Sequence, residues 1–571
     1  MNDGKLTGTA TALQEEEEIV VTSDEIDFEE EIFAVAAEFA MGTAEDDEPR
    51  SLDEAMGGSE AKEWKEAIRK EIAQLEKLRT WELVNPPPGA NLIGSRFHFK
   101  RKRGPDGEIQ SYKARVVAKG FKQVYGIDFY DTFAAGVKLA TECLILAYAA
   151  KEDWEIQQLD IKSAYLHAEL DEEIYMKPPP GYLPKGQEGK VCLLRKGLYG
   201  LKQAGRKWYQ TLHNTFQGLG FTRSHADHSV FYVSGGDNSI IVAVSVDDMT
   251  MAAKRMATID WLKAELSKRF EITDLGDIHW LLGVKITRDR QNRTITLSQG
   301  AYIESILNDF GMADCKPTLT PMDPGALLSH EQCPKTPREQ LEMQGHPYAR
   351  LLGKVMYAYL ISFPQLTFAV RTLAQFMHNP GKPHWEALKR VLRYLQGAKD
   401  SVLVLGATDN GLEAYSDSDH ARQIDRHSIS GFAFLYGGGA VSWSSKRQSV
   451  IALSSTEAEY IALANATREA IWLRRLYSEI VSPLAHPTPI FSDNQGVKSL
   501  MKDNMNHVCM KHIDVQYHFT REAVESHAIT IIYVPTEEMT ADIFMKLLPT
   551  PLFSKFCHAL RVRSAQGGVL R

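Results

Sequence analysis

The sequence predicts a multidomain protein of mixed α+β and α/β class, and three observations support this prediction. Its 571 residues, 44% of them hydrophobic and 24% charged, suffice for roughly three or four domains with cores of their own. Up to about residue 295, helical patterns are interspersed with hairpin patterns, which is typical of an α+β arrangement. After residue 404, three strand-like segments precede a long helix and a further strand, which indicates an α/β layer.

Residues 1–58 form an acidic segment that we expect to be largely disordered. Residues 1–55 contain 18 Asp or Glu and two basic residues, so they contribute −16 to a formal net charge of −9. Blocks of like charge with few aromatic residues oppose a packed core. The remaining chain carries 63 basic and 56 acidic residues, a positive excess of 7. This excess permits a polyanionic partner without requiring one, because an ordinary solvated surface can carry it.

A basic hairpin is predicted between residues 96 and 117. It follows an amphipathic helical pattern that starts near Trp64 and a proline-rich break at 86–89. Its two strand patterns, 96–100 and 110–117, are joined through a Gly-Pro-Asp-Gly turn. Lys and Arg are interleaved there with Phe and Tyr, as in strands that grip a phosphate backbone. A lysine-rich hairpin that only faces solvent is the alternative.

Asp247 and Asp248 are the most informative pair of charges, because they lie in the apolar run 240–251. Burying an unpaired carboxylate costs on the order of several kcal/mol, so such groups are usually paired or bind a metal ion. The β-branched and small residues before them favour a strand, and those after them a return strand. An exposed hairpin turn explains the pair equally well. Asp160, in the strand pattern 155–161, is the expected partner in a metal site.

A second group of acidic residues marks the C-terminal part of the chain. Asp417 ends the first predicted strand, and Glu459 lies within the long helix. Asp493 ends the later strand, and Asp542 opens the last helix. These positions make the four residues candidates for a second site.

Cysteine spacing and apolar runs argue against several classes of protein. The six cysteines show no C-x-x-C spacing, which favours a reducing, intracellular compartment over a disulfide framework or a zinc site. The N-terminus carries no basic-then-apolar signal pattern, and no run of about 18 apolar residues occurs. We therefore expect a protein that is not secreted and has no membrane partner.

Several motifs resemble, in order and spacing, a copia-type reverse transcriptase of long-terminal-repeat retrotransposons. The polymerase motifs are YKARVVAKGF at 112–121, LDI at 159–161, LYGLKQA at 198–204, VDD at 246–248 and DLG at 274–276. The motifs similar to the family's ribonuclease H domain are YSDSD at 415–419, SW at 442–443, LSSTEAEY at 453–460, SDN at 492–494 and KHID at 511–514. The resemblance covers residues 59–548.

The resemblance implies a right-hand polymerase followed by a ribonuclease H-like domain. Fingers and palm would occupy 59–295, thumb and connection 296–403, the ribonuclease H-like domain 404–548, and a C-terminal tail 549–571. The implied function is RNA-directed DNA polymerisation onto a primer, coupled to cleavage of the RNA strand in RNA/DNA hybrids. Implied partners are an RNA template, a DNA primer, the hybrid, deoxynucleoside triphosphates and other polyprotein products. The expected location is intracellular, in cytoplasmic virus-like particles or the nucleus.

The resemblance also assigns the metal ligands. In the polymerase site these are Asp160 and Asp247, with Asp248 in the same motif. In the ribonuclease H site they are Asp417, Glu459, Asp493 and Asp542, with Glu459 preferred to Glu457 because its phase in the helix matches the family pattern. Each site would hold two Mg²⁺, for which Mn²⁺ can substitute, because hard cations prefer carboxylate oxygen.

The remaining assignments concern substrate contacts. Lys113 and Arg115 fit triphosphate contacts, because charge develops on the transferring group. Tyr165 takes the place of the family's aromatic steric gate, with a core tyrosine as the alternative. Further assignments are the templating-pair loop at Gly200 and Lys202, the primer grip at Leu282 and Gly283, and a proton-transfer or merely structural histidine at His512.

Departures from the family pattern leave three interpretations open. Ser245 stands where a Tyr usually precedes Val-Asp-Asp, and Cys143 where Arg is usual. Loss of residues that support metal ligands commonly costs about one to two orders of magnitude. The chain could therefore carry both activities, ribonuclease H activity alone, or only nucleic-acid binding as a decayed relic. We find no zinc knuckle, protease or integrase motif, so we expect the C-terminal part of a polyprotein or an isolated fragment.

Overall fold

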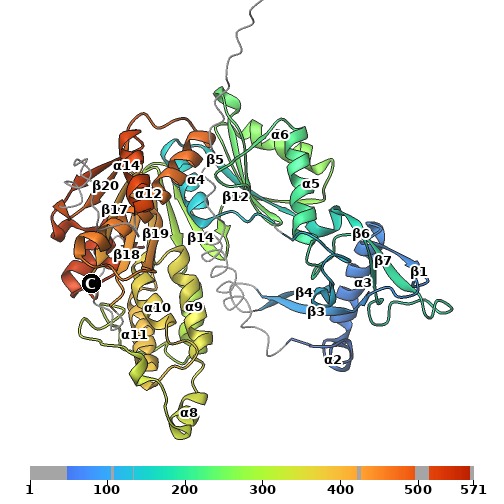
Figure 1. The fold of residues 1–571 in the computed structure, drawn as a ribbon. Coiled ribbons are helices and arrows are strands. Elements are labelled where there is room, and N and C mark those ends of the chain that lie inside the picture. Colours follow the sequence, from blue (N-terminus) through green and yellow to red (C-terminus); the bar gives the residue numbers. More distant parts are fainter. Residues whose placement is uncertain (1–47, 104–107, 133, 421–425, 496–513, 566–571) are drawn as a thin grey trace, which may run out of the picture.

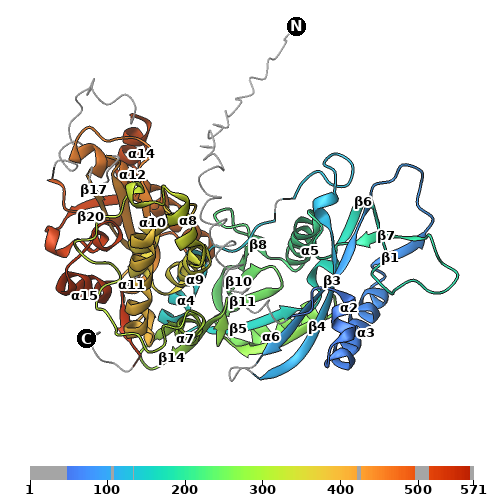
Figure 2. The ribbon, with the colours of Figure 1, turned by 90° about the horizontal axis from the view of Figure 1, so that it is seen from below.

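The computed structural model describes residues 48–565 except 104–107, 133, 421–425 and 496–513 (Figure 1). The N-terminal helices and hairpins lie at one end of the molecule, the sheet that carries Asp247 and Asp248 lies in the middle, and the C-terminal sheet lies at the other end (Figure 1, Figure 2). The predicted mixed α and β class is confirmed. Within the described ranges, every helix is too short or too polar to cross a lipid bilayer.

The N-terminal part consists of two small sheets and a helix that packs on one of them. Helix α3 (Ala61–Lys77) places Trp64 edge-on to Phe99 at 5.2 Å and to Tyr112 at 4.8 Å between ring centroids. These rings belong to the predicted basic hairpin, which is present as β3 (Ser95–Arg103) and β4 (Ile109–Ala118). The other sheet has the order β1-β7-β6-β2, with β1 (Trp81–Val84), β2 (Leu92–Ile93), β6 (Glu169–Met176) and β7 (Val191–Lys196).

Helix α2 (Leu52–Gly57) corrects the prediction for residues 1–58. Ser51 caps this helix by accepting a hydrogen bond from the Glu54 backbone N–H at 3.1 Å, and Ala55 is buried in the same core as Trp64. The prediction of a largely disordered segment is therefore wrong for its last part, because packing against α3 supplies a core that charge composition does not reveal. Residues 1–47 lie outside the described residues.

The middle of the molecule is a six-stranded antiparallel sheet whose strand order is β12-β5-β11-β10-β9-β8. The strands are β5 (Glu155–Ile161), β8 (Thr222–Arg223), β9 (Val230–Val233), β10 (Ile240–Ser245), β11 (Asp248–Ala253) and β12 (Ile272–Asp277). Helices α5 (Ala204–Gly218) and α6 (Met256–Ser267) cover one face, and α4 (Leu139–Lys151) covers the other. Both faces of β10 are buried, which explains its unbroken apolar sequence.

A third sheet joins strands from four of the predicted segments of the chain. Its order is β13-β14-β15-β16-β22, with β13 (Trp280–Leu281), β14 (Val284–Asp289), β15 (Thr294–Ser298), β16 (Ser401–Gly406) and β22 (Val562–Ser564). The predicted boundaries at 295/296 and 403/404 therefore cut through β15 and β16. The predicted tail 549–571 contains α15 (Thr550–Ala559) and β22. Local patterns missed this because the pairing strands are far apart in sequence.

Five α-helices lie between β15 and β16 in the chain, and four of them pack into one core with the third sheet, while α8 contributes only the partly buried Met343. They are α7 (Gly300–Asp309), α8 (Pro337–Gln344), α9 (Tyr348–Ile361), α10 (Thr367–Ala374) and α11 (Lys382–Ala398). Proline and charged residues at 316–344 predict a loop there, yet α8 lies within that stretch. Helical patterns are predicted after residue 344, where α9, α10 and α11 lie, whereas α7 precedes the stretch and was not predicted.

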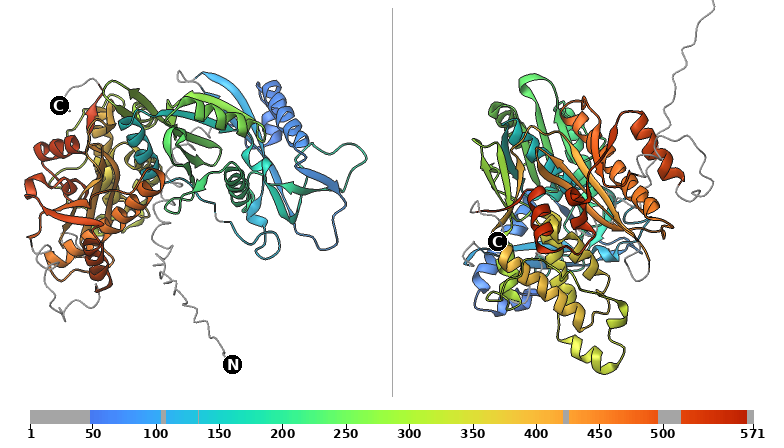
Figure 3. Two further views of the ribbon diagram at one scale, coloured as in Figure 1. Left: turned by 90° about the horizontal axis from the view of Figure 1, so that it is seen from above. Right: turned by 90° about the vertical axis from the view of Figure 1, so that its left-hand side faces the viewer.

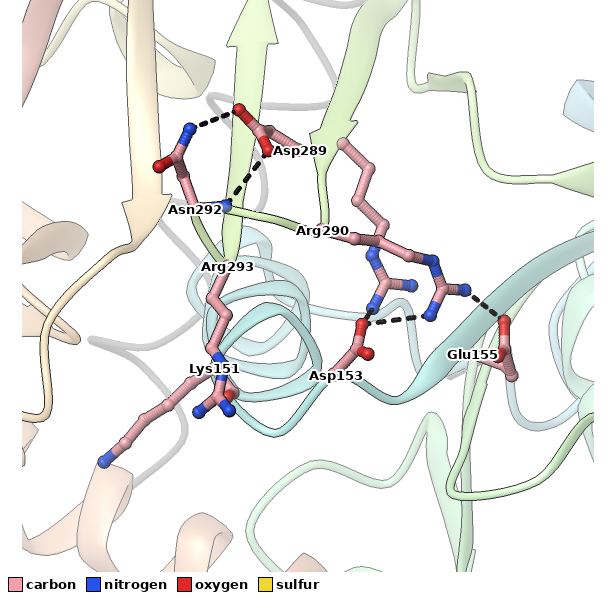
Figure 4. Close-up of polar contacts among 8 residues, drawn as sticks. Lys151, Asp153, Glu155, Asp289, Arg290, Asn292 and Arg293 are labelled. Carbon is pink, nitrogen blue, oxygen red and sulfur yellow. Dashed lines mark hydrogen bonds and ion pairs between the residues drawn. The ribbon is translucent and has the colours of Figure 1, made fainter.

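Ion pairs join the β14–β15 hairpin to the end of α4 (Figure 4). The Arg290 guanidinium donates to Asp153 at 2.9 Å and also binds Glu155, while Arg288 donates to the same Asp153 oxygen at 2.9 Å. On the other side of the hairpin, Arg293 donates to the Lys151 carbonyl oxygen at 3.3 Å. These contacts hold the third sheet against the middle sheet, directly beside the start of β5.

The C-terminal sheet has the order β19-β18-β17-β20-β21, antiparallel from β19 to β17 and parallel from β17 to β21. Its strands are β17 (Glu413–Asp419), β18 (Ile429–Tyr436), β19 (Gly439–Arg447), β20 (Thr488–Ser492) and β21 (Ile529–Tyr533). The long helix α12 (Ser455–Ile480) and α14 (Asp514–Glu525) pack together beside it. Three antiparallel strands before the helix match the predicted α/β layer.

Helix α12 also attaches the C-terminal sheet to the middle sheet (Figure 3). The Trp472 indole N–H donates to the Ala226 carbonyl oxygen at 2.8 Å. The Glu479 carboxylate accepts hydrogen bonds from the Ser224 hydroxyl at 2.6 Å and the His225 backbone N–H at 2.9 Å. One hydrophobic core runs from α4 through α9 and α11 to α12, so these parts form a continuous packed body.

Candidate catalytic sites

The structure brings the three predicted carboxylates of the middle sheet together. Asp248 pairs in register with Asp160 on one side and with Ser245 on the other. Residues directly opposite each other in an antiparallel sheet have their side chains on one face, about 5 Å apart at Cβ. The Ile161 backbone N–H donates to the Asp247 carbonyl oxygen at 2.9 Å, which holds the hairpin tip against the end of β5.

The hairpin tip is a strained two-residue turn. Val246 has φ +59°, a left-handed conformation that is rare for a β-branched residue. Such a φ is required at the first central position of a type II′ turn, where glycine is usual. The Trp208 indole N–H donates to the Val246 carbonyl oxygen at 2.6 Å and fixes the turn from α5. Sequence reasoning missed this role of Trp208.

Burial, followed by mutual repulsion, raises the pKa of two of these carboxyl groups. Partial removal from water and the charges of Asp247 and Asp160 raise the pKa of Asp248 to about 6. Burial, then Asp247, raises the pKa of Asp160, while Lys113 opposes the rise. An oxygen-only donor set with this excess of negative charge fits a hard divalent cation.

Four aromatic and basic side chains lie near these carboxylates. The Arg115 guanidinium lies 4.9 Å from the ring centroid of Tyr199, and the rings of Tyr199 and Tyr165 meet edge-on at 5.0 Å. Burial and the charge of Arg115 lower the pKa of Lys113. The negative charge of the nearby Asp160 acts in the opposite direction. The structure therefore gathers Lys113, Arg115 and Tyr165 beside the acids. Tyr199 completes this group, and only its place in the LYGLKQA motif signalled it.

The other predicted substrate residues lie at backbone turns. Gly200 has φ +88°, and a Cβ there would lie 2.2 Å from the Ala118 carbonyl oxygen, so close backbone packing explains this glycine. The Lys202 ammonium lies 4.5 Å from the ring centroid of Phe129. Leu282 and Gly283, both with positive φ, form the turn between β13 and β14, where the Tyr357 hydroxyl donates to the Leu282 carbonyl oxygen. Their roles in binding nucleic acid stay predictions.

Glu142 is a buried acid that sequence reasoning did not single out. It lies on α4 beneath the middle sheet with 1% of its surface exposed, and its Oε2 atom has no hydrogen-bond partner. Burial raises its pKa to about 8, and the charges of Asp227 and Asp248 add to the rise. The carboxylate of the nearby Asp227 has hydrogen-bond partners: it accepts from the Thr141 hydroxyl at 2.6 Å and from the Lys138 backbone N–H at 3.1 Å.

Replacing Glu142 with Gln should stabilise the protein at alkaline pH. Folding raises the pKa of this carboxyl from 4.5 to about 8, so the unfolded state loses its proton first and stability falls as pH rises through that window. Gln has no proton to lose, so we expect a gain on the order of a few kcal/mol at pH 9 and little gain at pH 5. Urea unfolding at both pH values measures it. Glu152→Gln, at the exposed end of α4, is the control, and equal pH profiles for both variants would contradict the prediction.

The acids of the C-terminal sheet form a tighter cluster. Asp417 on β17, Glu459 on α12 and Asp493 after β20 each offer a carboxylate oxygen, and these oxygens lie within 4.8 Å of one another. The predicted choice of Glu459 over Glu457 agrees with this geometry. Glu457 instead accepts the Leu453 backbone N–H at 2.7 Å and serves the start of α12.

Asp542 completes the cluster through a lysine. It lies in the 3-10 helix Thr540–Phe544, and the Lys546 ammonium donates to Asp542 at 2.5 Å and to Asp417 at 2.9 Å. Burial and hydrogen bonding to Asp417 raise the pKa of Asp542 to about 8. Burial and Asp417 also raise the pKa of Glu459 well above its usual range. His512 lies outside the described residues.

Comparison with known proteins identifies relatives among reverse transcriptases and transposon proteins. A family model described as reverse transcriptase (RNA-dependent DNA polymerase) matches residues 78–324. The Retrovirus-related Pol polyprotein from transposon TNT 1-94 of Nicotiana tabacum is 40% identical over 512 residues, which are 89% of this chain and 38% of that polyprotein. The putative transposon Ty5-1 protein of Saccharomyces cerevisiae is 33% identical over 314 residues, which are 54% of this chain and 100% of that protein. A solved foamy viral protease-reverse transcriptase in complex with double-stranded DNA is 12% identical, with a TM-score of 0.45 over 83% of this chain and 70% of that one.

The sequence matches define the class of the protein: with the family model over residues 78–324 and a relative that it covers in full at 33% identity, the chain belongs to the reverse transcriptase (RNA-dependent DNA polymerase) family. Its relatives in Nicotiana tabacum and Arabidopsis thaliana are retrovirus-related Pol polyproteins from transposons, and the predicted resemblance to the copia-type group is confirmed. The chain spans a little over a third of the length of these polyproteins, between 35% and 38%.

Proposed function

We propose that the chain is an RNA-directed DNA polymerase with a second, ribonuclease H-type site, and that both sites use Mg²⁺. The observation that carries this proposal is that Asp247 and Asp248, at the tip of the β10–β11 hairpin, lie beside Asp160 on the paired strand β5, with Lys113 close to Asp160. The proposed partners are an RNA template, a DNA primer, their hybrid and deoxynucleoside triphosphates, inside the cell. Other retroelement polyprotein products are further proposed partners.

In the polymerase site, Asp160 and Asp247 would hold the metal ions, with Asp248 beside them. When bound, the ions would neutralise the triphosphate and favour ionisation of the primer 3′-hydroxyl. Lys113 and Arg115 would bind the triphosphate, where negative charge shifts during transfer. Arg115 is held in place by the Tyr199 ring, so its guanidinium is already oriented before a substrate arrives.

In the second site, Asp417, Glu459 and Asp493 would hold metal ions together with Asp542. When bound, the ions would activate water against a phosphodiester of the RNA strand. Buried carboxylates with raised pKa values fit this role, because a bound cation would offset both the burial and the repulsion between the acids that raise these pKa values. Thr536 donates to Asp493 at 2.7 Å and orients that carboxylate.

Replacing Tyr165 with Ala should relax the choice between deoxyribonucleotides and ribonucleotides. If the Tyr165 ring borders the sugar, its removal makes room for a 2′-hydroxyl, and we expect a relative gain of at least tenfold for ribonucleotide incorporation, about 1.4 kcal/mol. Single-nucleotide incorporation with dTTP and UTP on a poly(rA) template measures the ratio. Tyr199→Phe, which keeps the neighbouring ring, is the control. An unchanged ratio of UTP to dTTP incorporation would indicate that Tyr165 is a core residue and not a steric gate.

Two assays on one preparation test the proposed function. Extension of oligo(dT) on poly(rA) reports polymerisation, and cleavage of a labelled RNA/DNA hybrid reports ribonuclease H activity, both with Mg²⁺ and Mn²⁺. We expect both activities, with slow extension because Ser245 provides no ring beside Asp248. Binding of the hybrid without either reaction would show a decayed relic.

Ribonuclease H activity alone is the second candidate function. Among the described residues, Asp417, Glu459 and Asp493 bring three carboxylate oxygens within 4.8 Å of one another. The polymerase acids Asp160, Asp247 and Asp248 do not form such a group. Hybrid cleavage without extension at any metal concentration would support this candidate.

A further inference from the structure

Lys546 occupies a cation position within the ribonuclease H-type site. Its ammonium donates to one oxygen of Asp417 and one oxygen of Asp542, at 2.9 Å and 2.5 Å. The two acceptor side chains are 2% and 8% exposed, while Lys546 is 21% exposed. The ion pairs are therefore shielded from solvent on the acid side, where charge interactions are stronger than at the surface.

The backbone around Lys546 holds its ammonium in this position. The Lys546 backbone N–H donates to the Asp542 carbonyl oxygen at 3.0 Å, so the chain turns back towards Asp542. The preceding residues Phe544 and Met545 are fully buried. The backbone of Lys546 is thus fixed by a hydrogen bond and by buried neighbours, whereas the backbone of an ordinary surface lysine is not.

Gly431 explains how this segment approaches Asp417. Gly431 pairs in register with Asp417, across β17 and β18. A Cβ at Gly431 would lie 2.6 Å from the Met545 side chain and 3.0 Å from Phe544 Cβ. The missing side chain lets the segment 540–546 pack against the strand beside Asp417, which brings Asp542 and Lys546 to the site.

We propose that Lys546 is a built-in counter-cation that takes the place of one divalent ion, so that the site without substrate binds a single ion at Asp417, Glu459 and Asp493. The four acids would carry a formal charge of −4 when all are ionised, and the lysine contributes one positive charge beside Asp417 and Asp542. A second ion could bind between those two acids only when the ammonium moves away. This inference rests on the proposed ribonuclease H-type function and specifies how that site is occupied.

Metal binding without turnover tests the inference. The background protein is the full chain with Asp160→Asn and Asp247→Asn, which removes the proposed polymerase ligands. Mn²⁺ is titrated, and the free ion is measured by electron paramagnetic resonance. We expect one bound Mn²⁺ that is lost with Asp417→Asn. With Lys546→Met we expect a second bound ion, or binding tighter by roughly tenfold, because a unit charge is removed from beside two acids.

Three further variants separate the outcomes. Lys546→Arg keeps the charge and should bind one ion, and Lys555→Met, an exposed lysine that donates to the Glu537 carbonyl oxygen, should behave as the background. Lys546→Gln replaces Lys546→Met if the latter does not fold, as judged by circular dichroism. In metal-free buffer, Lys546→Met should melt a few degrees lower than Lys555→Met, and Mn²⁺ should restore the loss, because the two acids have lost their counter-cation.

The possible failures can be told apart. If the background binds one Mn²⁺ through Asp417 and Lys546→Met binds it with the same number and affinity, the inference is overturned and the proposed metal site stands. If no variant shows binding that depends on Asp417, both the inference and the proposed metal site fail.

Discussion

Replacing Asp247 with Asn is expected to abolish primer extension, with a loss on the order of 10³-fold or more. The substitution keeps the size of the side chain and the backbone contact of the hairpin, in which Ile161 N–H donates to the carbonyl oxygen of residue 247. It removes one of the two carboxylates that would hold the metal ions. Steady-state extension of oligo(dT) on poly(rA) measures the effect, and hybrid cleavage by the same variant should be unchanged.

Asp237→Asn is the matched control for this prediction. Asp237 is an exposed carboxylate that pairs with Lys254 at 2.8 Å, near the other end of the same β10–β11 hairpin. It should leave extension at the wild-type rate. Extension that survives Asp247→Asn unchanged would disprove the assignment of the polymerase site, even if the chain is a polymerase.

Replacing Glu459 with Gln should have a comparably large effect on cleavage of RNA in a hybrid, again on the order of 10³-fold. Its carboxylate is buried among Asp417 and Asp493, so the neutral amide removes a charged ligand and leaves the packing of α12 in place. Cleavage of a labelled RNA/DNA hybrid with Mg²⁺ measures the loss. Primer extension should continue, because the two sites use different acids.

The neighbouring Glu457 supplies the comparison. Glu457→Gln keeps an oxygen that can accept the Leu453 backbone N–H, so the start of α12 survives and cleavage should remain close to wild type. If the two substitutions reduce cleavage equally, the site assignment on α12 is wrong, and the loss reflects damage to the helix.

Local sequence was sufficient for the elements that carry the site. The apolar run before Asp247 indicated a strand because its β-branched and small residues suit a strand covered on both faces. The spacing of apolar residues after Ala61 indicated α3, and the phase of Glu459 within its motif placed it with Asp417 and Asp493. These features depend on short-range periodicity and on motifs, and both can be recognised from residues that are close together in the sequence.

The limits of the domains could not be predicted from local sequence. Strand β16 pairs with β15 on one side and with β22 near the end of the chain on the other. Pairing between strands more than 100 residues apart leaves no local periodicity, so the boundaries at 295/296 and 403/404 and the tail 549–571 did not match the structure. Helix α2 was missed for a different reason: its acidic composition hides a buried contact, because α3, which follows it directly in the chain, supplies its core.

By itself, the sequence determined the order of the motifs, the family and the acids of both candidate sites. Only the tertiary structure decided which other side chains stand beside those acids. Trp208 fixes the strained turn at Val246, Tyr199 orients Arg115, and Lys546 reaches Asp417 because Gly431 leaves room for it. Each of these contacts joins residues more than 30 positions apart, and their chemistry follows from distance in space, which a pattern of neighbouring residues does not encode.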